Sequence, residues 1–452
     1  MVMTPALIVP DQASWTMWGR DLGGLGLTPA AAPEQARQLV VPDPVPAALT
    51  EAVNAAWQRM PAPRRYVAWP RPLAGTPAAE LLADDAPARR DNQSAPGHED
   101  APGGHGADAG HDHHDMMAIV GDPSADGLVM ESIDFALGPL AAGLPGGLVL
   151  DLSLDGDVVE RCEARATLMP EPIGGGACGD PTASATWTVA VALAHERAAA
   201  ARPDEATARI RVAAVETERA LSHVSWLRAF GLVLGWSELG ERAERAVKAL
   251  MPLRTRLELT VVAPGNADGL EGLAAGLEAS RRPVERALAL LEGSRRLRSR
   301  TRGRAKIPRD RIAGTKVAGT VARAAGIPCD ARAGDPLYEA LGFRETTLAG
   351  GDAEARTLLR TAEAASALNL AIAALGEGGS REPMPADLSA ETAVEGPRGP
   401  VRARFENGRL EASAPGAAAL LDLAGEAVSG LELGSALAAL ASFDLSGWRV
   451  PE

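Results

Sequence analysis

Cysteine is nearly absent from this sequence. The chain has only three, Cys162, Cys178 and Cys329, and they form no C-x-x-C pair. Their number and spacing exclude a disulfide framework, a four-cysteine zinc site and an iron–sulfur cluster held by neighbouring cysteines. Cys329 has no cysteine partner near it, and we expect it to be a small buried hydrophobic residue.

Long apolar runs and a basic excess are also missing. No stretch reaches the roughly 18 to 20 apolar residues that span a bilayer. The first residues, Met1 to Pro5, lack the charged start and apolar core of an export signal. The net charge of -14 argues against general affinity for nucleic acid. We expect a cytoplasmic protein, peripheral on the inner face of the cell membrane, where a partner holds it.

The chain is long enough, and contains enough apolar residues, to form two or three domains with their own cores. Its 452 residues are 46% hydrophobic but only 3% aromatic, so Ala, Leu and Val must fill the cores. Composition predicts a small α/β segment at 1–85, a flexible linker rich in His, Asp and Gly at 86–116, and a larger domain at 117–452. The expected fold class is α+β.

The first region has the pattern of a βαβ unit. Short buried strands are predicted at 38–41 and 65–69, on either side of an amphipathic helix at 46–60. This order and spacing favour a right-handed crossover between parallel strands.

The predicted linker holds five of the seven histidines. Because neutral imidazoles spaced two and three residues apart chelate nickel or zinc, His105, His111, His113 and His114 are candidate ligands. They lie among acidic and glycine residues without any periodicity, so we expect such binding to be adventitious.

The larger region is predicted to be a mainly helical bundle with peripheral β hairpins. Hairpins are expected at 148–159, turned at Asp155-Gly156, and at 401–412, turned at Asn407-Gly408. Asp180 and Pro181 have the pattern of a helix start. The sequence predicts helices over 180–195, 204–234, 238–252, 266–292, 352–375 and 416–441.

Motifs of this region occur in the order of a known family. They are Gly138-Pro139, Glu216 to Arg219 with His223, Gly319 to Gly326, Asp330-Ala331-Arg332, Gly351-Asp352 with Arg356 and Arg360, and Glu395 to Gly399. From about residue 130 to 452, this set resembles the nickel–iron hydrogenase large subunit superfamily. That superfamily includes the quinone-site subunit of respiratory complex I, the NADH-quinone oxidoreductase. The resemblance implies a hydrogenase-large-subunit-like helical bundle.

The first region is similar to a second component of the same complexes. Asp21 to Gly26, Pro33 to Val41 and Met60 to Trp69 resemble motifs of the small electron-transfer subunit of complex I. The resemblance implies a shortened, degenerate small subunit fused to a large subunit.

The chain departs from the family at the metal ligands. Catalytic relatives hold a nickel–iron site with two C-x-x-C pairs, and here the first pair falls near Ser184 and Trp187 and the last near Ser446 and Arg449. Hydroxyl, indole and guanidinium groups do not replace the soft anionic thiolates that such metals need.

Electron input and the quinone pocket of the family are altered as well. Residues 1–85 contain no cysteine, and the stretch from Gly138 to Ala142 lacks the histidine that the family has in its quinone pocket. We therefore expect neither a nickel–iron site nor an iron–sulfur cluster, while quinone stays an open alternative as ligand.

Five polar residues are candidates for the central cavity, and no catalytic residue is assigned. Glu216, Arg219 and His223 are spaced by three and four residues, so they share one face of a helix. The resemblance places Asp330 and Arg332 at the cavity. The five residues either handle protons there or form structural ion pairs beside a core histidine. Because the metal-ligating cysteines of the family are absent from this sequence, we favour the structural role for Glu216, Arg219 and His223.

One stretch is strongly basic. From Arg295 to Arg311 the chain has nine basic residues and one acid, a composition that binds nucleic acid or anionic lipid head groups. Because the rest of the chain is acidic, we favour a contact with another subunit or a membrane surface.

Together with the resemblance, these observations predict a hydrophilic subunit of a complex I-like membrane assembly. It would couple or scaffold antiporter-like and other membrane subunits without a redox centre of its own, and it would not bind nucleic acid. One alternative is an oxidoreductase subunit that still binds quinone in a degenerate cavity. A second is a hydrogenase assembly or maturation factor. Whether the chain is an enzyme stays open.

Overall fold

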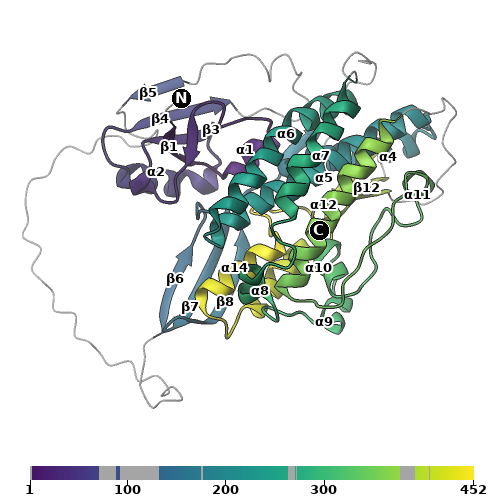
Figure 1. Cartoon of the computed structure of the whole chain (residues 1–452). Coiled ribbons are helices and arrows are strands. Elements are labelled where there is room, and N and C mark those ends of the chain that lie inside the picture. Colours follow the sequence, from purple (N-terminus) through teal and green to yellow (C-terminus); the bar gives the residue numbers. More distant parts are fainter. Residues whose placement is uncertain are drawn as a thin grey trace, which may run out of the picture.

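The computed structural model describes residues 3–70, 88–91, 132–174, 177–262, 270, 272–376, 392–406 and 408–452. These residues form a helical bundle flanked by four separate sheets, which confirms the predicted α+β class (Figure 1). The candidate metal ligands His105, His111, His113 and His114 lie outside the described residues.

The N-terminal segment is built on a five-stranded sheet in the order β2-β1-β3-β4-β5. Strands β1 to β4 are parallel, and β5 runs antiparallel to β4. The predicted strands and helix correspond to β3, α2 and β4, while β1, β2 and β5 are not found from the sequence. The elements are β1 Thr4–Ile8, α1 Gln12–Met17, β2 Leu27–Pro29, η1 Pro33–Gln35, β3 Gln38–Asp43, η2 Ala47–Leu49, α2 Thr50–Arg59, β4 Arg65–Pro70 and β5 Ala88–Asp91.

The core of this segment continues into the larger domain. Leu168 and Trp448 from the larger domain belong to the same buried cluster as Trp15 and Trp57. Across the same boundary, Asp11 Oδ2 accepts a hydrogen bond from the Gly146 amide at 2.7 Å. The two parts therefore share one hydrophobic core.

The long helices of the larger domain pack around α5. Helices α4, α6 and α12 contact it directly, and every residue of α5 from Val212 to Leu227 is buried. A helix that is buried on all faces runs through the interior, where its polar side chains must find partners. The long helices are α4 Ser184–Ala198, α5 Glu205–Val233, α6 Ser237–Val262, α7 Leu273–Leu288 and α12 Ala353–Ala374.

Shorter elements surround this bundle. The strands are β6 Ile133–Leu137, β7 Leu148–Asp155, β8 Val158–Ala166, β9 Glu171–Gly174, β10 Ala177–Gly179, β11 Thr392–Gly396, β12 Gly399–Glu406 and β13 Arg409–Ser413. The helices are η3 Pro181–Ala183, α8 Arg295–Thr301, α9 Arg309–Ala313, α10 Gly319–Ala324, α11 Pro336–Ala340, α13 Ala417–Ala427 and α14 Leu433–Phe443. None of the described helices is long and apolar enough to cross a membrane.

Both predicted hairpins form, and two local predictions need correction. In the first hairpin Asp155 pairs with Val158, so the turn is Gly156-Asp157, one residue later than predicted. The single helix predicted at 416–441 is two helices, α13 and α14. The chain bends between them at Gly430, whose φ of 77° is outside the helical region.

Candidate functional site

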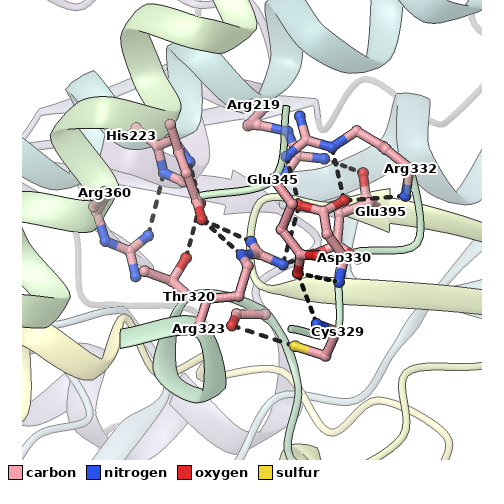
Figure 2. Close-up of polar contacts among 12 residues, drawn as sticks. Arg219, His223, Thr320, Arg323, Cys329, Asp330, Arg332, Glu345, Arg360 and Glu395 are labelled. Carbon is pink, nitrogen blue, oxygen red and sulfur yellow. Dashed lines mark hydrogen bonds and ion pairs between the residues drawn. The ribbon is translucent and has the colours of Figure 1, made fainter. Parts of the chain in front are cut away.

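The candidate residues meet in the interior, where α5, α10, α12, β11 and the loop after α10 come together. Glu216, Arg219 and His223 lie on α5, and Asp330 and Arg332 lie on the loop. Figure 2 shows the side chains of Arg219, His223, Asp330 and Arg332 converging with those of Arg323, Arg360 and Glu395. The charged groups of this region are at most 6% exposed, so each of them needs a partner inside the protein.

Glycine at the start of α10 makes this convergence sterically feasible. Gly319 has a φ of 68°, and a Cβ atom there would lie 2.8 Å from the Arg398 carbonyl oxygen. The close approach lets α10 direct Thr320 and Arg323 toward Glu363 of α12. Thr320 Oγ1 donates to Glu363 Oε2 at 3.0 Å, and Arg323 Nε donates to Glu363 Oε1 at 2.8 Å.

Glu216 is joined to the Asp330 loop by Arg332. Arg332 Nη1 donates to Glu216 Oε2 at 3.0 Å, while its Nε and Nη2 bind both oxygens of Asp330 at 2.9 and 2.7 Å. Arg219 Nε lies 3.2 Å from Glu216 Oε2, and the Tyr338 hydroxyl donates to Glu216 Oε1 at 2.9 Å. The structure thus brings four of the five predicted residues into one cluster.

Arg323 connects this cluster to the rest of the site. Besides Glu363, its Nη1 contacts Glu395 Oε1 at 2.7 Å and Asp330 Oδ2 at 3.3 Å. Burial opposes ionisation of Asp330, but the hydrogen bond and charge of Arg332, with Arg323, hold its pKa below the usual value. Arg323 lies within the quoted Gly319 to Gly326 motif, yet sequence reasoning did not single it out.

His223 points away from Glu216, although the two residues share α5. Its Nδ1 lies 3.2 Å from Arg360 Nη1, and its Nε2 lies 3.6 Å from Glu363 Oε2. Burial, with the nearby charges of Arg360 and Arg219, lowers the pKa of His223 to about 4, against the opposing effect of Glu363. The imidazole is therefore neutral near pH 7, and His223 contacts Arg360 and Glu363, which are not partners of Glu216.

A continuous set of charges extends from Glu216 toward the C-terminal segment. Arg360 Nη1 donates to Asp444 Oδ2 at 2.8 Å, and Arg398 Nε lies 3.5 Å from the same oxygen. We call this set the buried charge network: Glu216, Arg219, His223, Arg323, Asp330, Arg332, Arg360, Glu363, Glu395, Arg398, Asp444 and Asp180. The number of arginines in the network is close to the number of carboxyl groups, so their charges nearly cancel. In an interior of low dielectric, buried charges need such opposite partners.

The position of the last family cysteine pair lies at one end of this network. Ser446 Oγ donates to Asp180 Oδ2 at 2.9 Å, and Asp180 also accepts from Arg398 Nη1 at 3.3 Å. Together with Trp187, these residues line a small cavity of about 90 Å³. A hydroxyl group, an indole and an ion pair are not a donor set for nickel–iron or iron–sulfur chemistry, so the residues present do not fit such a group.

The other two former ligand positions lie elsewhere. Ser184 hydrogen-bonds to Arg254 and Glu258, in a second buried cluster that includes Glu218. Arg449 Nε donates to the Ala166 carbonyl at 2.9 Å. The structure therefore gathers Trp187 and Ser446 at one cavity and separates them from Ser184 and Arg449.

A larger cavity of about 520 Å³ lies between the N-terminal segment and the larger domain. Its wall includes Leu140, Ala141 and Ala142, from the motif that lacks the family histidine, and also Trp226, Trp236 and Trp448. Thr182, Arg398, Asp444 and Ser446 line it as well. One end of the buried charge network therefore borders this cavity.

Comparison with protein families identifies the central part of the chain. Residues 265–399 match the family described as respiratory-chain NADH dehydrogenase, 49 Kd subunit. Over these residues the predicted resemblance to complex I is confirmed. The 49 kDa subunit match contains α10, α12, β11 and the Asp330 loop, which together supply Arg323, Asp330, Arg332, Arg360, Glu363 and Glu395 to the network.

Comparison with solved structures supports the same fold over a longer range. A chain from the structure of the membrane-bound sulfane sulfur reductase, an archaeal respiratory membrane complex, is similar over 70% of this chain and 97% of that chain. The sequence identity is 19% and the TM-score is 0.60, so this likeness shows the fold alone. No curated protein matches. The similarity of the first region to a small subunit stays a prediction.

Proposed function

We propose that this protein is a hydrophilic subunit of a complex I-like respiratory membrane assembly. In this role it couples or scaffolds antiporter-like membrane subunits and has no redox centre of its own. The 49 kDa subunit family match and the fold shared with a chain of an archaeal respiratory membrane complex support the assembly.

The observation that carries the proposal is the chemistry at the former ligand positions. The hydroxyl of Ser446 donates a hydrogen bond to Asp180, and Asp180 forms an ion pair with Arg398. The side chain of Trp187 is 1% exposed and packs in a hydrophobic cluster. Ser446, Asp180 and Arg398 thus bind one another, and Trp187 is held by apolar packing, so each of these side chains has a structural role that needs no metal.

The buried charge network supports a coupling or scaffolding role. It joins α5, α10, α12, β11 and the segment after α14 through ion pairs that have almost no access to water. Breaking such a pair leaves a charge unpaired in the interior, which typically costs about 3 to 5 kcal/mol. The elements it connects therefore respond to a displacement as one unit.

A pull-down tests the assignment. Tagged protein is recovered from membranes solubilised in mild detergent, and its partners are identified by mass spectrometry. We expect antiporter-like membrane subunits in stoichiometric amounts. The control uses cells that lack those subunits, in which a high-salt wash should release the protein from the membrane fraction. Recovery with a hydrogenase precursor in place of membrane subunits would instead favour an assembly factor.

A second candidate function is binding of quinone in the larger cavity. The observation that favours it is a cavity of about 520 Å³ bordered by three tryptophans and by the end of the charge network. Because quinones quench indole fluorescence, titration with a short-chain quinone should reduce the tryptophan emission. Ala229→Phe, which narrows the cavity, should abolish this quenching, while Ala199→Phe at the exposed end of α4 should leave it intact. Equal quenching of both variants would show that quinone does not bind there.

A further inference from the structure

The basic stretch from Arg295 to Arg311 forms an exposed surface on α8, α9 and the segment between them. Leu297, Thr301, Ala305, Ile307 and Ile312 are buried at intervals along it and fix the backbone to the core. The charged residues between them are all exposed. We call this surface the arginine ridge: Arg295, Arg296, Arg298, Arg300, Arg302, Arg304, Lys306, Arg309 and Arg311.

The chain's own acids neutralise only part of the ridge. Glu354 lies 3.5 Å from Arg298 and 3.9 Å from Arg302, and Glu426 pairs with Arg311. Within the described part of the chain, no acidic partner is found for Arg295, Arg304, Lys306 or Arg309. In a protein of net charge -14, such a concentration of uncompensated cations is a local positive patch that attracts anionic partners.

Apolar and aromatic side chains border one end of the ridge. Arg296 lies over the ring of Trp236, with its guanidinium carbon 5.6 Å from the ring centroid, and its Nη2 donates to the Gly235 carbonyl at 2.6 Å. Leu232, at the end of α5, is 51% exposed. Tryptophan, leucine and arginine side by side are typical of surfaces that lie at a lipid–water interface.

We infer that the arginine ridge binds the anionic head groups of a membrane surface, with Trp236 and Leu232 at the level of the head groups. This inference rests on the proposed membrane association and adds a direct lipid contact that needs no partner subunit. Nucleic acid is the less favoured anion, because the neighbouring apolar residues Trp236 and Leu232 have no role in a contact with its phosphate backbone.

Vesicle binding tests the inference on the full chain. Vesicles of phosphatidylcholine mixed with phosphatidylglycerol should bind the protein at low salt and release it as salt rises, and vesicles of phosphatidylcholine alone should not bind it. The triple variant Arg304→Gln, Lys306→Gln, Arg309→Gln removes charges without an internal partner, so its fold should be retained. We expect about 100-fold weaker binding to the anionic vesicles.

The matched control removes three exposed charges elsewhere. Arg245→Gln, Arg282→Gln and Arg286→Gln on α6 and α7 change the net charge equally and should leave vesicle binding within about twofold of wild type. Equal binding of the two triple variants, or tighter binding to duplex DNA than to anionic vesicles, would overturn the inference. If the protein fails to bind vesicles but the pull-down still recovers membrane subunits, the ridge inference alone is refuted. If it binds vesicles but the pull-down recovers no membrane subunit, the proposed function is refuted.

Discussion

The Ser446 hydroxyl donates a hydrogen bond to Asp180, which lies 266 residues away in the sequence. Ser446 stands near a position where the resemblance places a metal-binding cysteine. The same carboxylate accepts from Arg398, which also donates to Thr182 Oγ1 at 2.9 Å. The side chain at the former ligand position is thus part of a complete hydrogen-bonded set.

The first prediction concerns redox metals. Protein purified anaerobically should show no iron–sulfur absorbance and no stoichiometric nickel or iron by elemental analysis, because hydroxyl, indole and guanidinium groups occupy the former thiolate positions. A stoichiometric cluster bound to this chain alone would contradict the absence of a redox centre.

The second prediction concerns Arg323 as the central cation of the network. Arg323→Met leaves Glu363, Glu395 and Asp330 without their shared partner, so the free energy of unfolding should fall by about 3 to 5 kcal/mol. The matched control is Arg165→Met, which removes the exposed pair with Asp151 and should cost about 1 kcal/mol or less. Urea denaturation measures both. Similar losses in the two variants would show that the buried pairs contribute no more than a surface pair.

The third prediction is a pH dependence that comes from His223. Its pKa is lowered to about 4 in the folded protein, from an ordinary value of 6.5. Between these values the unfolded chain takes up a proton that the folded chain does not, so stability is full above pH 6.5 and falls toward pH 4, by roughly 3 kcal/mol in total.

His223→Gln should remove this share of the pH dependence and flatten the stability curve between pH 6.5 and 4. His195→Gln, at an exposed position on α4, is the control and should keep the slope of the wild type. If His223→Gln keeps the same slope as His195→Gln, the buried imidazole does not remain neutral in the folded state.

The fourth prediction concerns the histidine-rich segment. Deletion of residues 95–114 should leave the melting temperature nearly unchanged, since the segment has too few apolar residues to contribute to a core. Any nickel or zinc binding, measured by calorimetry, should disappear with the deletion. A large drop in melting temperature would mean that the segment packs against the fold.

The regular elements were predictable because their signals are local. The β3–α2–β4 unit follows from short apolar runs around an amphipathic helix. The start of η3, directly before α4, follows from Asp180, whose side chain accepts from the Thr182 amide at 2.8 Å. The break between α13 and α14 was missed because apolar residues are frequent on both sides of it. Gly430, with its φ of 77°, and Glu432, whose side chain caps the start of α14, mark the bend.

The site was predictable only in part, because its contacts join distant segments. The spacing of Glu216, Arg219 and His223 correctly places them on one helix, but α5 is buried all round, so neighbours on one helix face meet different partners. Glu363 and Glu395 belong to the site because both bind Arg323. They lie 40 and 72 positions after Arg323 in the sequence, and no local pattern predicts contacts over such separations.

Leu168 and Trp448 complete the core of the N-terminal segment, so this segment has no finished hydrophobic interior without the larger domain. In a complex of separate chains, such a contact forms only as far as concentration and affinity allow. On one polypeptide the two parts meet at an effective concentration that their covalent connection sets, which favours docking without any new contact. Their one-to-one stoichiometry is fixed by synthesis, and neither half can exchange for a copy from another complex.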